Sequence, residues 1–95
     1  MTSSETADGR RVWLVERTYS DDEQNLIILT YATTDGKQYF RKERALTSGS
    51  DIRETTAAVE AEPSNLGTVN DPELREQYAN EAQRMAAEHD PGDAI

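Results

Sequence analysis

Residues 25–45, NLIILTYATTDGKQYFRKERA, decide the fold, because they read as two strands joined by a tight turn. Leu26 to Leu29 form an unbroken apolar run, which favours a central strand buried on both faces. Asp35-Gly36 fits the positive φ angles of a two-residue type I′ connection. Thr34 then faces Lys37, and this one pair fixes the register of the whole ladder.

That register puts large apolar groups on both faces of the hairpin. On one face it pairs Ile27 with Arg44, Leu29 with Lys42 and Tyr31 with Phe40; on the other it pairs Ile28 with Glu43, Thr30 with Arg41 and Ala32 with Tyr39.

The segments on either side extend this sheet. Residues 10–19, RRVWLVERTY, are rich in β-branched and aromatic side chains and predict a preceding strand, joined by the polar turn 20–24. Residues 54–62 alternate around Val59 and predict a fourth strand, although their Ala and Glu content also fits a short helix. Residues 64–70 are expected to be a linker.

A C-terminal helix is predicted over residues 72–89. Asp71 is a good N-cap, and Pro72 suits the first helical position. An apolar stripe recurs every three or four residues, as expected for a helix that packs along one side. The stripe consists of Leu74, Tyr78, Ala82, Met85 and His89.

The predicted fold is therefore α+β, in the order β-β-β-β-α, with a four-stranded antiparallel sheet and the helix packed on one face. The 95 residues fit one domain. We expect it to span residues 10–91, after a disordered lead at 1–9 and before a tail at 92–95.

One helix covers only one of the two apolar faces, so the other face needs a cover. A homodimer or a protein partner is the first expectation, because soluble monomers rarely expose large apolar patches. The aliphatic stems of Lys and Arg offer an alternative that needs no partner. The predicted interaction surface consists of Trp13, Ile27, Leu29, Tyr31, Phe40, Lys42 and Arg44.

The charge is strongly acidic, at −9, with 31% charged residues against 35% hydrophobic ones. Residues 47–95 carry 11 acidic and 3 basic side chains, whereas residues 1–46 carry 8 and 7. Eight of the ten basic residues are arginine. Such a composition is typical of halophilic proteins, whose self-repulsion is screened in molar salt. An ordinary acidic domain is the alternative.

No catalytic site emerges. Cysteine is absent, which excludes disulfides and thiolate chemistry. The one histidine, His89, stands at the predicted helix end, where a packing role or a favourable charge explains it better than catalysis. The turn Asp21-Asp22-Glu23 lacks the spacing of a calcium loop. We expect no cofactor, no bound metal and no specific small molecule.

Two stretches, Tyr31–Leu46 (YATTDGKQYFRKERAL) and Asp71–Pro91 (DPELREQYANEAQRMAAEHDP), resemble those of a small haloarchaeal protein family of unknown function. The resemblance runs over most of residues 10–91. It implies a halophilic setting and one intact domain, and it brings no activity or site residues.

The expected function is a non-enzymatic, dimeric interaction module. Its location is expected to be cytoplasmic, because no apolar run approaches the ~18 residues of a membrane span and residues 1–9 lack a signal-peptide core. The alternative is a sheet that stacks single-stranded nucleic acid on Trp13, Tyr31 and Phe40 beside Lys42 and Arg44. The negative charge makes nucleic acid the weaker candidate. An enzyme ranks third.

Overall fold

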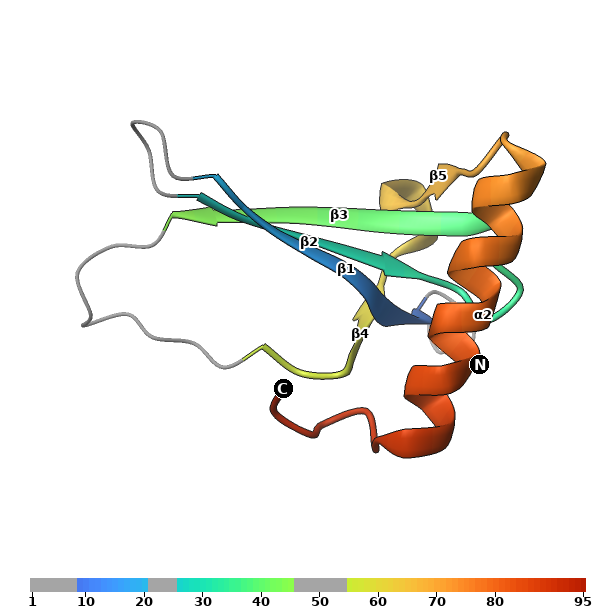
Figure 1. Ribbon diagram of the computed structural model, residues 1–95. Coiled ribbons are helices and arrows are strands. Elements are labelled where there is room, and N and C mark those ends of the chain that lie inside the picture. The colour runs from blue at the N-terminus through green and yellow to red at the C-terminus, as the bar shows by residue number, and fades with distance from the viewer. Residues whose placement is uncertain (1–8, 21–25, 46–54) are drawn as a thin grey trace, which may run out of the picture.

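The structure is a computed structural model that describes residues 9–20, 26–45 and 55–95. It confirms an α+β fold with an antiparallel sheet and one C-terminal helix, but the sheet has five strands rather than four (Figure 1). The elements are β1 (Arg10–Ser20), β2 (Leu26–Ala32), β3 (Gln38–Ala45), β4 (Ala58–Ala61), the 3₁₀ turn η1 (Pro63–Asn65), β5 (Gly67–Thr68) and α2 (Pro72–Glu88).

The strand order is β4-β1-β2-β3-β5, and every neighbouring pair is antiparallel. The predicted fourth strand at 54–62 is shorter than expected, since β4 begins only at Ala58. The predicted linker at 64–70 contains β5, which sequence reasoning missed. Gly67 explains why β5 exists: a Cβ there would stand 2.4 Å from Cε1 of Tyr39, so only glycine lets the two strands pair at this point.

The predicted register of the β2–β3 hairpin is confirmed, with Ile27 facing Arg44 and Tyr31 facing Phe40. The turn differs from the prediction. Thr33 O accepts from Gly36 N at 2.8 Å, and Thr33 N donates to Gln38 O at 3.1 Å, so the loop has four residues rather than two. Gly36 alone supplies the left-handed conformation, at φ 72°.

Helix α2 begins where the sequence predicted, and Glu73 N donates to the side chain of Asp71 at 3.1 Å. Ala82 and Met85 are its buried residues. The helix crosses one end of the sheet, close to the β2–β3 loop (Figure 1). Gly36 lies so close to it that a Cβ would stand 2.0 Å from the carbonyl oxygen of Arg75.

The helix covers the face of the sheet that carries Tyr39 and Arg41, because Tyr78 of α2 lines a hollow with both side chains. Trp13 and Ala32 share that face through the ladder register. They are 7% and 0% exposed. The sequence left open which face the helix covers.

The opposite face carries Ile27, Leu29 and Tyr31, which are all buried within the chain. β4 and β5 stand at opposite edges, which four strand spacings would separate by about 19 Å in a flat sheet. The connection from Ala61 to Gly67 includes a 3₁₀ turn and reaches only about 16 Å. The edges must therefore approach each other, and Leu66 of this connection packs against the core.

Pro91 and the predicted tail at 92–95 form main-chain hydrogen bonds with residues 55–58. Ala57 N donates to Asp93 O at 2.9 Å, Ala58 N to Pro91 O at 3.1 Å, and Ile95 N to Thr55 O at 2.9 Å. These bonds hold the C-terminal residues against the beginning of β4 and the residues before it. Most of the predicted lead at 1–9, the acidic turn 21–23 and the loop 46–54 lie outside the described residues.

Candidate interaction surface

The predicted interaction surface divides between the two faces of the sheet. Trp13 lies on the helix-covered face, at 7% exposure. Three of the remaining members lie buried on the opposite face: Ile27, Leu29 and Tyr31 are 4%, 1% and 2% exposed. These four side chains are packed within the chain.

The other members lie on β3. Phe40 is partly buried, and its ring stands 6.0 Å from that of Tyr31 in a tilted arrangement. Lys42 is exposed, while Arg44 is placed by its pairing with Ile27. An aromatic platform for bases would need open ring faces, and Trp13 and Tyr31 do not offer them.

The surface that β3 does present is its own outer edge. Residues along an antiparallel ladder alternate between facing one neighbour and the other. Thr33 N bonds Gln38 O, so Gln38, Phe40 and Lys42 turn their main-chain groups toward β2. Tyr39, Arg41 and Glu43 therefore turn theirs outward.

β5 occupies only the beginning of this edge. It pairs with Gln38 and Tyr39, and Val69 N extends the contact to Lys37 O at 2.9 Å. Beyond Tyr39, β2 is the only strand of the described residues that pairs with β3, and Figure 1 shows β5 alongside one end of the outer side of β3. No strand within 9–20, 26–45 and 55–95 bonds the outward N–H and C=O groups of Arg41 and Glu43.

Next to this open edge lies a hollow of about 330 Å³. Its apolar walls come from Leu74 and Tyr78 of the helix and from Tyr39 of β3, and Arg41 stands at its border with the edge. Burial, together with the nearby carboxylate of Glu16, raises the pKa of Tyr78, while Arg41 acts in the opposite direction. The Tyr78 phenol thus stays protonated and can donate a hydrogen bond.

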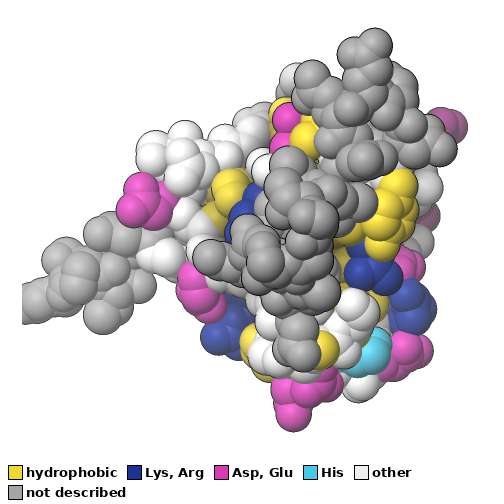
Figure 2. Space-filling view, turned by 90° about the vertical axis from the view of Figure 1, so that its left-hand side faces the viewer, with side chains coloured by type: hydrophobic (Ala, Val, Ile, Leu, Met, Phe, Trp, Pro, Cys, Tyr) yellow, Lys and Arg dark blue, Asp and Glu magenta, His cyan; other side chains and the backbone are white. Residues whose placement is uncertain are grey.

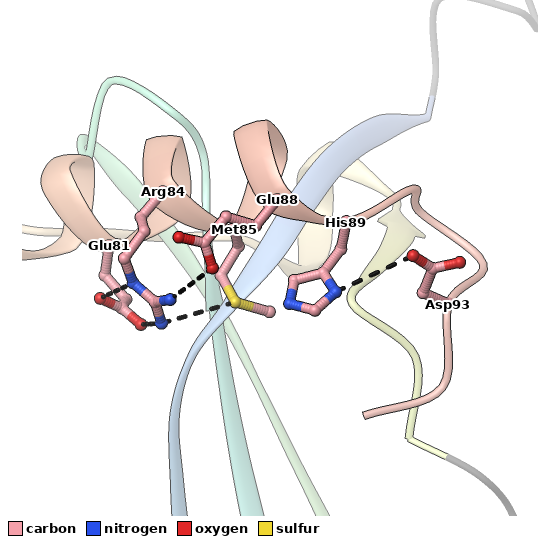
Figure 3. Close-up of polar contacts among 6 residues, drawn as sticks. All are labelled: Glu81, Arg84, Met85, Glu88, His89 and Asp93. Carbon is pink, nitrogen blue, oxygen red and sulfur yellow. Dashed lines mark hydrogen bonds and ion pairs between the residues drawn. The ribbon is translucent and has the colours of Figure 1, made fainter.

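A second hollow, of about 580 Å³, lies between the helix and β1 and shares Leu74 and Tyr78 with the first. Its wall carries Arg84, which forms ion pairs with Glu81 and, at 2.9 Å, with Glu88 (Figure 3). The hydrogen bond from Arg84 lowers the pKa of Glu81. Arg84 is therefore already paired within its own helix, which leaves it a weak attractor for an added anion.

His89 caps the C-terminus of α2, where its N–H donates to Met85 O at 2.9 Å. Its Nδ1 stands 3.8 Å from Oδ2 of Asp93, which points toward it in Figure 3. Among the described residues, no group of three His, Asp or Glu side chains is arranged to hold a metal ion. No helix within the described ranges is long and apolar enough to cross a membrane.

Seen from the end of the molecule distant from α2, Lys and Arg side chains lie beside Asp and Glu side chains around the margin of the view (Figure 2). The open part of β3 repeats this mixture in one strand, as Arg41, Lys42 and Glu43 are all exposed. Charged residues on an edge strand are a common protection against unspecific pairing. Any strand that adds here must match these charges.

The sequence contained part of the signal for this surface. The register placed Arg41 and Tyr39 on one face, and the helical stripe contained Leu74 and Tyr78. What it did not contain was the position at which the helix crosses the sheet, and the short β5 that leaves the rest of the edge open. Both depend on contacts between residues roughly thirty to fifty positions apart, such as Gly67 with Tyr39 and Gln83 with Thr34.

No curated protein and no solved structure matches this chain. A family of unknown function (DUF7967) matches residues 6–95, which include every described element of the fold. The chain therefore belongs to this family of unknown function.

Proposed function

We propose that this chain is a non-enzymatic interaction module that binds an extended segment of a partner protein along the open edge of β3. The observation that carries the proposal is the outer side of β3 from Arg41 to Arg44, which no strand of the described residues pairs with, next to the hollow of Tyr39, Leu74 and Tyr78. Strand addition of this kind draws affinity from main-chain hydrogen bonds and specificity from pockets for alternate side chains.

Geometry supports the proposal in two ways. An added strand would continue the line of β5, so the sheet needs no rearrangement to receive it. A side chain placed opposite Arg41 would project on the helix side, where the hollow of about 330 Å³ has room for it.

The proposal includes the environment in which the chain works. A net charge of −9 and a basic set of eight arginines and two lysines support a location in the cytoplasm of a halophilic archaeon. In molar salt the Debye length falls to ~3 Å, so long-range charge contributes little there and contact hydrogen bonds dominate recognition.

The test uses linear peptides selected for binding to the folded chain from a random library in 2 M NaCl. Glu43→Pro removes the outward N–H at the centre of the edge, and proline is tolerated at an edge position whose N–H faces solvent. We expect this variant to keep its unfolding temperature and to lose peptide affinity at least about tenfold, since one tenfold step corresponds to ~1.4 kcal/mol.

Two controls separate main-chain from side-chain recognition. Glu43→Ala keeps the N–H and should bind the peptides almost as well as the unchanged chain. In an antiparallel ladder only every second peptide N–H faces β3. N-methylation of those amides should abolish binding, whereas N-methylation of the amides between them should leave binding unchanged. The proposal is refuted if no peptide is selected, or if the selected peptides bind Glu43→Pro undiminished.

A further inference from the structure

We propose that the partner strand is β3 of a second copy of this chain, paired antiparallel about Lys42 so that Arg41 of each copy faces Glu43 of the other. This inference rests on the proposed function, because it names the occupant of the same edge. It replaces the predicted dimer through the buried face of Ile27 and Leu29 with a dimer through the strand edge.

The register follows from which residues face outward. Arg41 and Glu43 both turn their main-chain groups away from β2, so a second copy must pair outward residues with outward residues. Three symmetric registers are then possible, with the twofold axis at Arg41, Lys42 or Glu43.

Charge selects among the three. An axis at Arg41 sets arginine directly against arginine, and an axis at Glu43 sets glutamate against glutamate. The axis at Lys42 sets Arg41 against Glu43 twice. Opposite charges in directly facing positions stabilise a ladder, and like charges destabilise it. The remaining like pair, Lys42 with Lys42, lies on the other face, where exposed lysine stems can splay apart.

The length of the ladder sets the expected strength. β5 blocks the edge at Tyr39, so the two copies share only residues 40–44. Two facing pairs give about four main-chain hydrogen bonds. We expect a dissociation constant in the micromolar to millimolar range, which is typical of small, transient interfaces.

Salt should strengthen the dimer. Each copy carries a net charge of −9, and the resulting long-range repulsion is screened when the Debye length falls from ~10 Å at 0.1 M to ~3 Å at 1 M. The ion pairs of Arg41 with Glu43 are direct contacts and depend less on long-range fields.

The test exchanges the facing charges one chain at a time. Arg41→Glu makes both facing pairs Glu with Glu, and Glu43→Arg makes both Arg with Arg. Mixing the two variants restores two opposite pairs in a heterodimer. Sedimentation equilibrium in 2 M NaCl, from 10 µM to 1 mM, measures each sample.

We expect a concentration-dependent dimer for the unchanged chain, a dissociation constant raised about tenfold or more for each variant alone, and recovery to within about threefold for the equimolar mixture. Both substituted positions are exposed, so the variants should unfold at the temperature of the unchanged chain.

Three results overturn the inference: a monomer throughout this range, a dimer indifferent to both charge changes, or a mixture no tighter than its components. The proposed function is tested separately. If library peptides still bind in a manner that depends on the Glu43 N–H while the chain remains monomeric, strand addition stands and only self-pairing fails.

Discussion

The two edges of the sheet are treated in opposite ways. At the β4 edge, main-chain groups beside the strand are bonded by the C-terminal residues, with Ala57 N on Asp93 O and Ala58 N on Pro91 O. At the β3 edge, β5 pairs with two residues and then leaves. The edges also differ in composition, since the closed one is lined by Ala57 and Ala58 and the open one by Arg41, Lys42 and Glu43.

This difference indicates how the chain avoids unspecific association. Small apolar residues on a free edge would pair with any extended chain, so an alanine-rich edge has to be covered. A charged edge can remain open, because each incoming strand must supply matching charges. The edge most suited to selective binding is thus the one that the described residues leave free.

Deleting residues 91–95 should have the largest effect on this contrast, since it opens the closed edge. It removes three main-chain hydrogen bonds, each contributing ~0.5–1.5 kcal/mol, so the free energy of unfolding should fall by roughly 2–4 kcal/mol in urea titrations. Asp93→Ala is the matched control, because it keeps the backbone and loses only the side-chain contacts to Asp90 N and His89 Nδ1. A deletion no more costly than this control would contradict closure by the backbone.

Gly67→Ala should have the next largest effect, at the open edge. The new Cβ would collide with the ring of Tyr39, and overpacking of this kind costs about 1–3 kcal/mol. Detachment of β5 should also speed hydrogen exchange at the Tyr39 amide. Gly92→Ala, which adds a Cβ with no atom within 4 Å, should change neither quantity. Equal stability of the two variants would argue against the contact between β5 and Tyr39.

Asp35→Ala tests the loop that fixes the register of the open edge. The carboxylate accepts from Thr33 Oγ1 at 2.6 Å and from Lys37 N at 2.9 Å, so its loss should cost about 1 kcal/mol at this exposed position.

The same carboxylate gives the loop a pH dependence. The hydrogen bond from Thr33, followed by that from Lys37 N, lowers the pKa of Asp35 in the folded chain. Its stabilisation is present above the unfolded value of ~3.9 and is lost as pH falls through the folded pKa. Asp35→Asn keeps an acceptor oxygen but cannot titrate, so its free energy of unfolding should fall less as the pH is lowered. If unfolding measurements from pH 5 to pH 2 show the same loss of stability in this variant, other carboxylates are responsible for it.

Arg11→Ala should have the smallest effect. Arg11 pairs with Glu60 across β1 and β4 at 3.0 Å, with both side chains more than half exposed. Such pairs contribute 0 to about 1 kcal/mol and weaken further in salt. We expect no measurable change in the free energy of unfolding at 1 M NaCl. A larger loss there would mean that ion pairs, and not the C-terminal backbone, close the β4 edge.

Local signals carried most of the fold. The apolar run from Leu26 to Leu29 and the Asp35-Gly36 pair predicted the hairpin register, and Asp71-Pro72 predicted the helix start. The register survived although the turn has four residues, because two extra loop residues placed symmetrically leave the same partners facing each other. The turn type itself depended on contacts with the helix that no local pattern records.

Non-local features could not be predicted. The pairing of β5 rests on Gly67 meeting Tyr39, and a two-residue strand has no periodicity to detect. The sequence predicted one helix for two apolar faces, so the second apolar face was expected to need a partner. Burial of Leu29 and Tyr31 within the chain answers that requirement.

The contact between Gly36 and the helix also constrains the order of assembly. The loop and the helix backbone approach closely because Gly36 has no Cβ, which would stand 2.0 Å from the carbonyl oxygen of Arg75. Gln83 then bonds Thr34 O at 2.9 Å and holds the helix on the same loop. We expect the central hairpin to form in the folding transition state and the helix to dock afterwards, so destabilising the loop should slow folding more than it speeds unfolding.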